Sequence, residues 1–157
     1  MNRRFLAVCM LLLFWTAAHA QTNPSKVDYF SAQDIQKQLA DLAPGAQSSG
    51  SSGSTLGDYT SHQLKLSVRT SSGGAEIHTH YDDVFVVTQG HATLITGGTV
   101  EDPKTDADGE TKGPSIRDGN TQVISAGDVV HIPAGTPHQL KIAPGMLFST
   151  LVVKVKE

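Results

Sequence analysis

The chain has 157 residues, of which 38% are hydrophobic and 17% are charged, and its formal net charge is −3 at pH 7. This length and apolar content suit one domain of ordinary size that buries its own core. Basic residues form no clustered face, so the sequence argues against binding to nucleic acid. Cys9 is the only cysteine, which excludes a disulfide framework.

The first twenty residues are typical of a secretory signal peptide. Arg3 and Arg4 form a charged start, an apolar run follows from Phe5 to Trp15, and Ala18-His19-Ala20 fits a small-x-small cleavage site. A membrane span needs about 20 apolar residues, more than this run provides. We therefore expect cleavage after Ala20, a periplasmic or secreted location, and no stable membrane span after processing. Loss of the two arginines takes the charge from −3 to −5.

A single helix is predicted from Tyr29 to Leu42. Ser31 and Asp34 have the spacing of a capping box, and Pro44-Gly45 predicts the end of the helix. Apolar residues recur within it at helical spacing, namely Ile35, Leu39 and Leu42. We expect this stripe to dock on the rest of the fold, and an oligomer contact such as a homodimer is the alternative.

The stretch from Ala46 to Ser54 consists almost entirely of Ser and Gly. This composition is typical of a mobile linker because it has little to bury. We therefore predict that residues 21–55 form the helix and a flexible linker. Residues 56–157 are predicted to form a separate β domain.

From Leu56 onward the pattern is that of short strands separated by Gly and Pro turns, which indicates an all-β sandwich or barrel. Leucine and valine alternate with Lys65, Ser67 and Arg69 between residues 64 and 69, which predicts a half-buried strand. Later strands are predicted at 84–87, 92–95, 123–124, 129–132, 139–142 and 146–155. Residues 97–122 are poor in apolar side chains and are predicted to be a long protruding loop. We place Lys154 and Lys156 on the solvent side of the last strand.

Two histidines, His78 and His80, stand two residues apart before an apolar strand. If they belong to a strand, their side chains project from the same face and can converge on one metal ion. A neutral imidazole nitrogen is a good donor for divalent transition metals, and a nearby carboxylate adds charge compensation. Asp83 is the expected carboxylate, with Asp82 as the substitute.

A second pattern combines a turn at Gly127, an apolar strand, a Pro133-x-Gly135 turn and His138. Together the two stretches resemble the paired motifs of the cupin superfamily. The first family motif is an H-x-H pair, then an acid and a glycine, and the second is G-x5-P-x-G-x2-H. Gly127, Pro133, Gly135 and His138 match this second pattern at the family spacing, whereas Ile142 stands where the family motif ends in asparagine.

The first family motif is matched by His78, His80 and Gly90. Counting back from Gly90 places Asp83 where the family usually has glutamate. The loop between His80 and Asp83 is at least one residue shorter than the usual pattern.

The resemblance implies a double-stranded β-helix, a jelly-roll β-barrel, preceded here by one short N-terminal helix. It also implies a divalent ion (Fe, Mn, Ni, Zn or Cu) inside one end of the barrel, with His78, His80, Asp83 and His138 as ligands. Tyr81 and Gln139 adjoin these ligands and are the pocket candidates. Arg69 and Arg117 are polar groups that could lie near the barrel mouth, where an arginine could pair with an acidic substrate. We favour the alternative that both are surface residues.

Three functions fit these expectations. One is a metal-dependent enzyme, of dioxygenase or isomerase type, that acts on a small oxygen-rich molecule. The second is a module that binds a metal or small ligand without turnover, and the third is an interaction unit with a vestigial site. No separate general base or nucleophile stands out in the sequence, and a fold alone does not establish a function.

We predict that the mature protein begins at Gln21, because a charged start, an apolar run and an Ala-x-Ala site occur in the order that signal peptidase requires. N-terminal sequencing of the exported protein measures this directly. A chain that retains Met1, or one acylated at Cys9, would contradict it.

Overall fold

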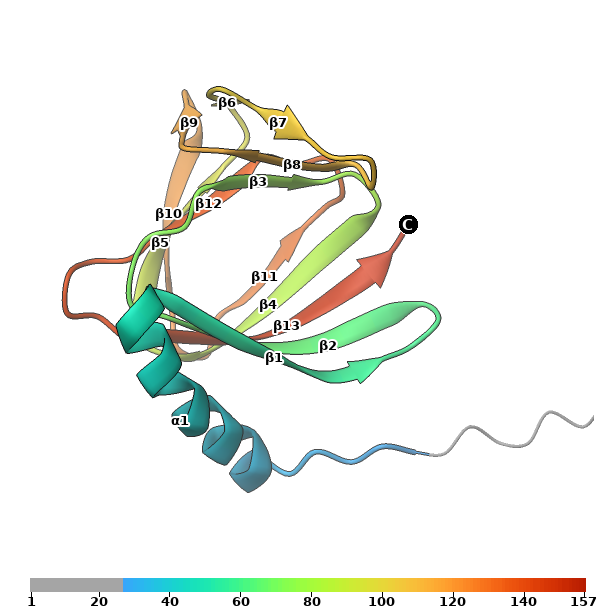
Figure 1. The fold of residues 1–157 in the computed structure, drawn as a ribbon, viewed down its shortest axis with the longest axis vertical. Helices are drawn as coiled ribbons and strands as arrows, with labels where there is room; N and C mark the ends of the chain where they lie inside the picture. Colours follow the sequence, from blue (N-terminus) through green and yellow to red (C-terminus); the bar gives the residue numbers. More distant parts are fainter. Residues whose placement is uncertain (1–26) are drawn as a thin grey trace, which may run out of the picture.

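The computed structural model describes residues 27–157 (Figure 1). The predicted signal peptide lies outside the described residues. Among the described residues, no helix has both the length and the apolar character needed to span a membrane.

The described chain contains one helix and thirteen strands. In chain order they are α1 (Ala32–Ser49), β1 (Ser51–Asp58), β2 (His62–Arg69), β3 (Ala75–His78), β4 (Tyr81–Gln89), β5 (His91–Thr96), β6 (Thr99–Val100), β7 (Lys104–Thr105), β8 (Glu110–Gly113), β9 (Ile116–Arg117), β10 (Asn120–Ser125), β11 (Val129–Ile132), β12 (His138–Lys141) and β13 (Phe148–Lys156).

The strands form two facing antiparallel sheets. One sheet has five strands in the order β1-β2-β13-β4-β11, and the other has six in the order β10-β5-β12-β3-β8-β7. A small pair, β6 and β9, stands beside them. Figure 1 looks between the two sheets, with α1 outside the β1–β2 edge. The architecture confirms the predicted all-β jelly roll with one helix.

Two apolar clusters stabilise this arrangement. The first fills one end of the space between the sheets and is built around Phe85, Leu94 and Phe148. The second joins α1 to the outer face of the five-stranded sheet through Leu39, Leu66 and Val68, among others. The predicted helix stripe therefore docks on the barrel, as expected. The other end of the space between the sheets is left for polar side chains.

The turn between β4 and β5 was predicted from Gln89-Gly90-His91 and is confirmed. Gly90 has φ of 75°, a region that L side chains rarely adopt. A Cβ at this position would lie 2.2 Å from the carbonyl oxygen of Leu147. Glycine is therefore required both by the backbone conformation and by the close approach of the neighbouring chain.

The predicted end of the helix is wrong. The Ser31 N-cap is confirmed, because its hydroxyl accepts the Asp34 N–H at 3.0 Å. The helix, however, continues through Pro44 and is capped by Gly50. Its last turn is fixed by tertiary contacts: Ala46 is fully buried, and its carbonyl accepts a hydrogen bond from the Thr70 hydroxyl at 2.6 Å. These contacts outweigh the backbone donor that the proline lacks.

The flexible linker predicted for Ala46 to Ser54 is also wrong. This stretch contains the end of α1 and the start of β1, which pairs with β2 over Ser51 to Asp58. The predicted boundary at residue 55 thus falls inside a strand. Small residues suit this edge strand because its stability comes from main-chain pairing rather than from side-chain burial.

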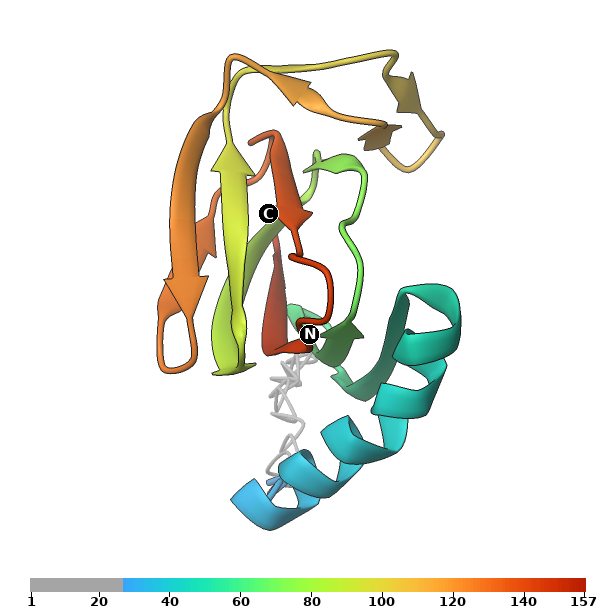
Figure 2. The same cartoon turned by 90° about the vertical axis from the view of Figure 1, so that its left-hand side faces the viewer.

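The excursion between β5 and β10 is not a loop, contrary to the prediction for residues 97–122. It contains four short strands, β6 to β9, and β8 extends the six-stranded sheet by pairing with β3. Figure 2 shows this excursion, coloured yellow to orange, across the top of the barrel. Its low apolar content misled the prediction because these strands are held mainly by backbone hydrogen bonds. The excursion brings Glu110 and Lys112 beside β3.

We predict that Leu39→Ala destabilises the protein by about 2–4 kcal/mol, because it removes a buried side chain from the cluster under α1. Chemical denaturation measures the change. Gln33→Ala, at an exposed position of the same helix, is the matched control. Equal effects of the two substitutions would show that α1 does not pack on the barrel.

Candidate metal centre

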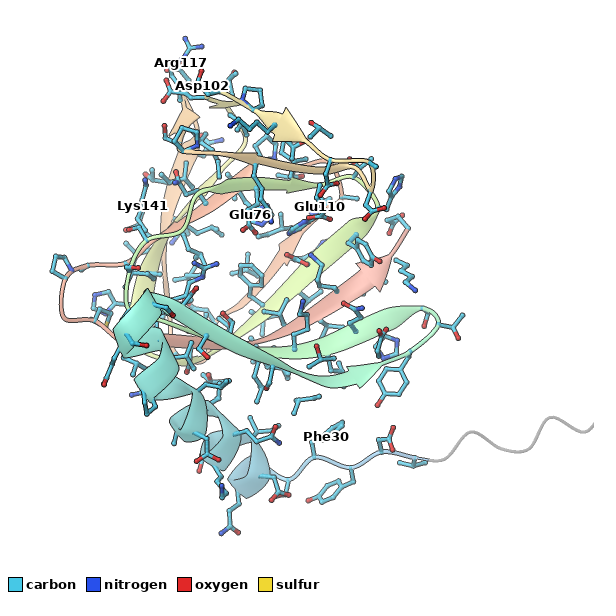
Figure 3. All side chains as sticks on the ribbon, in the orientation of Figure 1. Phe30, Glu76, Asp102, Glu110, Arg117 and Lys141 are labelled. Carbon is cyan, nitrogen blue, oxygen red and sulfur yellow. The ribbon has the colours of Figure 1, made fainter. Side chains whose placement is uncertain are left out.

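The pair of side chains that share the inner face of β3 is Glu76 and His78, not His78 and His80. β3 ends at His78, and the chain then turns through Thr79 and His80. His78 is 8% exposed, whereas His80 lies in the exposed class. The expectation that both histidines lie on one strand face is therefore wrong, because the period of two applies only within the strand. Figure 3 shows Glu76 and Glu110 pointing into the space between the sheets.

Two further groups reach the same place from other strands. Asp83 on β4 is 4% exposed and places Oδ2 3.3 Å from the Nε2 atom of His78. His138 on β12 is also 4% exposed, and its Nε2 lies 3.9 Å from the same oxygen. The structure thus brings together three of the four predicted ligands from both sheets.

Glu76 joins His78, Asp83 and His138 to form a cluster of four side chains. Its Oε2 lies 3.8 Å from His78 Nε2, and one ligand atom from each of Glu76, His78 and His138 lies within 4.8 Å of the others. Glu76 was not among the ligands predicted from the sequence. The signal was present, because Glu76 is two residues before His78 and strand periodicity places them on one face.

The nitrogen of each histidine that points away from the cluster is held by an oxygen acceptor. His78 Nδ1 donates to a carboxylate oxygen of Glu110 on β8, and His138 Nδ1 donates to the Thr136 carbonyl at 3.1 Å. Such contacts fix the ring orientation and the tautomer that leaves Nε2 free as a donor to a metal. Glu110 was also not predicted from the sequence as a site residue, since it lies in the predicted loop.

Lys154 compensates the buried charge of Asp83. Its Nζ lies 3.1 Å from Asp83 Oδ1, as an ion pair rather than an aligned hydrogen bond, and 5.3 Å from the ring centroid of Tyr81. Only 14% of the Lys154 side chain is exposed, so the solvent-facing position predicted for it is wrong. The two oxygens of Asp83 have separate partners, the ammonium group on one side and the histidines on the other.

The local charges set the protonation of the cluster. Burial raises the pKa of Asp83, but His78 and Lys154 outweigh burial and hold that pKa below its ordinary value. Burial lowers the pKa of His138, and the Thr136 carbonyl only partly offsets it. Burial also lowers the pKa of His78, yet hydrogen bonding to Asp83 and Glu110 raises it overall. Asp83 is therefore ionised and His138 neutral near pH 7.

The cluster forms part of the wall of a cavity of about 550 Å³ that opens between the sheets. Phe85, Leu140 and Val152 contribute apolar surface to the wall. The His138 ring packs edge-on against Phe85, with centroids 6.4 Å apart. A small molecule that enters this cavity therefore meets the imidazoles and carboxylates directly.

The remaining predicted site residues have other surroundings. Tyr81 borders a separate depression together with His80 and Asp108. Gln139 borders the main cavity, but its side-chain NH₂ donates to the carbonyls of Gly73 and Pro114, at 2.9 and 3.1 Å. Gln139 is thus a buried brace next to His138.

Asp82, the substitute carboxylate, fixes the Pro-x-Gly turn rather than joining the cluster. It accepts hydrogen bonds from the Ala134 N–H at 2.7 Å and from His131 at 3.0 Å. The His131 and Ala134 hydrogen bonds lower the pKa of Asp82. Its role is to connect the start of β4 to the turn that precedes His138.

No family model matches the sequence, and no curated protein is significantly similar to it. Solved structures do resemble it. The cupin domain of Cnp3 from Schizosaccharomyces pombe aligns with a TM-score of 0.52 at 11% identity, over 68% of this chain and 65% of that domain. This chain has the cupin fold.

Two enzymes of known structure are similar to this cupin barrel. The polyketide cyclase RemF from Streptomyces resistomycificus has a TM-score of 0.51 at 20% identity, over 69% of this chain and 66% of the cyclase. The DMSP lyase DddQ from Ruegeria pomeroyi has a TM-score of 0.50 at 15% identity, over 68% of this chain and 47% of the lyase. The chain thus spans less than two thirds of each of them, and the likeness concerns the fold.

The geometry also changes the register of the first cupin motif. With Glu76 and His78 as the pair, four residues separate His78 from Asp83, and six separate Asp83 from Gly90. The loop before Asp83 is then two residues longer than the loop that follows His80, which was at least one residue too short. Glu76 stands at the position of the first histidine of the pair, and His80 belongs to the turn.

We predict that Glu110→Gln weakens divalent-metal binding about 10–100-fold, because the neutral amide no longer orients the His78 ring with a charged acceptor. Competition with a chelator on the purified protein measures the affinity. Glu101→Gln, which removes the same charge from an exposed position of the same excursion, is the control. An equal effect of the two substitutions would show that Glu110 acts only through the overall charge.

Proposed function

We propose that this protein is an exported cupin that binds one divalent transition-metal ion through Glu76, His78, Asp83 and His138, and presents it to a small oxygen-rich molecule in the barrel cavity. The observation that carries this proposal is the convergence of both Nε2 atoms and the Asp83 carboxylate at one point of the cavity wall. His80, a predicted ligand, is outside the proposed set.

The spacing of the donors fits such an ion. Two ligand atoms that are each about 2.1 Å from one ion in tetrahedral geometry are about 3.4 Å apart. The observed separations from Asp83 Oδ2 to the two Nε2 atoms are 3.3 and 3.9 Å. Two imidazoles and two carboxylates suit iron, manganese, nickel or zinc, and the carboxylates neutralise the charge of a divalent ion.

The chain supports the site with groups that do not contact the ion. Glu110 and the Thr136 carbonyl orient the imidazoles, and Lys154 holds the Asp83 carboxylate by its other oxygen. Phe85 and Val152 give part of the cavity wall an apolar surface. A bound divalent ion would supply Lewis-acid chemistry, and redox chemistry if it were iron, which is the basis of the isomerase- or dioxygenase-type activity.

A second candidate is a binding module without turnover. One observation favours it: the cavity-lining histidines and carboxylates, five in all, belong to the cluster or contact it. Within the described residues, the cavity therefore has no separate imidazole or carboxylate as a general base. Oxygen consumption and product formation with a panel of diols and organic acids separate the two candidates.

We predict that His78→Ala and His138→Ala each abolish stoichiometric metal binding, because each removes a donor from a site with few alternatives. Elemental analysis and chelator competition on zinc- and manganese-loaded protein measure this. Glu76→Gln is expected to weaken binding, since it replaces a charged oxygen donor with a neutral one.

His80→Ala is the matched control, because it removes a histidine two residues from His78 whose side chain lies outside the cluster. It should leave the metal content unchanged. Loss of metal in His80→Ala, with retention in His78→Ala, would place the site on the turn and refute the proposed ligand set. Circular dichroism confirms that each variant is folded before its metal content is compared.

A further inference from the structure

The β2 side of the cavity wall carries cationic side chains that the proposed metal site does not use. Leu66 on β2 is buried in the apolar cluster under α1. The residues that alternate with it, Lys65, Ser67 and Arg69, line the cavity. The alternation predicted for this strand is confirmed, but its polar face is turned into the barrel. Arg69 is therefore a cavity residue, contrary to the surface position predicted for it.

The cavity wall has more positive than negative groups. Four cations (Lys65, Arg69, Lys112 and Lys154) face three carboxylates (Glu76, Asp83 and Glu110). Only Lys154 of these cations forms an ion pair with a carboxylate in the part of the chain that the structure describes. A divalent ion at the cluster would add to the positive excess. A half-enclosed cavity with an excess of positive charge favours an anionic ligand.

The guanidinium group of Arg69 lies against the backbone of Gly73. A Cβ built on Gly73 would lie 2.8 Å from Arg69 Nη1, so the group rests against bare backbone. That backbone is fixed, because the Gly73 N–H donates to the Leu140 carbonyl at 3.0 Å and the Gly73 carbonyl accepts from Gln139 at 2.9 Å. The planar guanidinium group that lies against this backbone matches the geometry of a carboxylate.

The guanidinium group of Arg69 and the metal-binding side chains are close enough for one small molecule to contact both. Gly73 and Glu76 are three residues apart along the chain, so their Cα atoms are separated by at most about 11 Å. Both residues line the same cavity.

We infer that the ligand of this cavity is a small organic acid. Its carboxylate is bound by Arg69 with help from Lys65, and its other oxygen-bearing end contacts the proposed metal site. This inference rests on the proposed metal-binding function only for the end of the ligand that contacts the metal site. The carboxylate end is recognised by residues that do not touch the cluster.

The test uses the dicarboxylates succinate, glutarate and adipate as probes, each paired with its neutral diamide. Binding to the purified protein is measured by calorimetry, with and without manganese, after the bound metal has been quantified in every sample. In the manganese-loaded protein, paramagnetic broadening of the probe carbon signals locates each carboxyl group relative to the ion.

Arg69→Gln is expected to weaken dicarboxylate binding about tenfold or more, which is the effect of losing one charge-assisted hydrogen-bonded pair, without changing the diamide affinity or the metal content. Arg117→Gln is the matched control, since Arg117 is exposed and pairs with Glu101 and Asp118 outside the cavity. Equal effects of the two substitutions, or equal affinity of the native protein for acid and diamide, would overturn the inference.

Gly73→Ala provides a second test that keeps every charge. The new methyl group would displace the Arg69 guanidinium from its position against residue 73. The backbone conformation of Gly73 does not itself require glycine. We expect a weaker preference for acid over diamide with unchanged metal content, and an unchanged preference would contradict the inference. If the native protein binds no metal, the proposed function fails, whereas the Arg69-dependent preference is still decided in the metal-free protein.

Discussion

The site depends on where β3 ends. Because the strand stops at His78, the two-residue period of a strand joins Glu76 to His78 and releases His80 into the turn. The pairing of β3 with β8 then places Glu110 opposite His78 and Lys112 opposite Glu76. One strand boundary thus determines which histidine enters the barrel, which carboxylate accompanies it and which residue orients its ring.

Charge compensation is the second constraint on the site. Burying the charged Asp83 side chain between two sheets would be costly without partners. Each of its two carboxylate oxygens has a different partner. Lys154, its direct cross-strand neighbour on β13, takes the first oxygen. The histidines take the second, which is the oxygen available to an ion. The Lys154 pair therefore sets the orientation of Asp83 in the cluster.

The barrel and half of its site were readable from the sequence because they rest on local features. The Gly90 turn, the Pro133-x-Gly135 turn and the spacing to His138 each have a short-range cause.

Glu110 and Lys154 were missed because only the sheet pairing brings them to the cluster. Arg69 was misplaced because alternation shows that a strand has two faces, but not that a helix covers the apolar face and the polar one lines a cavity. Pro44 misled for a similar reason, since buried Ala46 stabilises a last helical turn that local propensity disfavours.

The measurement that tests this account most directly is anomalous X-ray diffraction from crystals of the zinc-loaded protein. The account predicts one ion inside the barrel, bonded to the Nε2 atoms of His78 and His138 and to carboxylate oxygens of Asp83 and Glu76 at about 2.0–2.2 Å. His80 should lie outside the coordination sphere. An ion bonded to His80, or no ion between the two sheets, would contradict it.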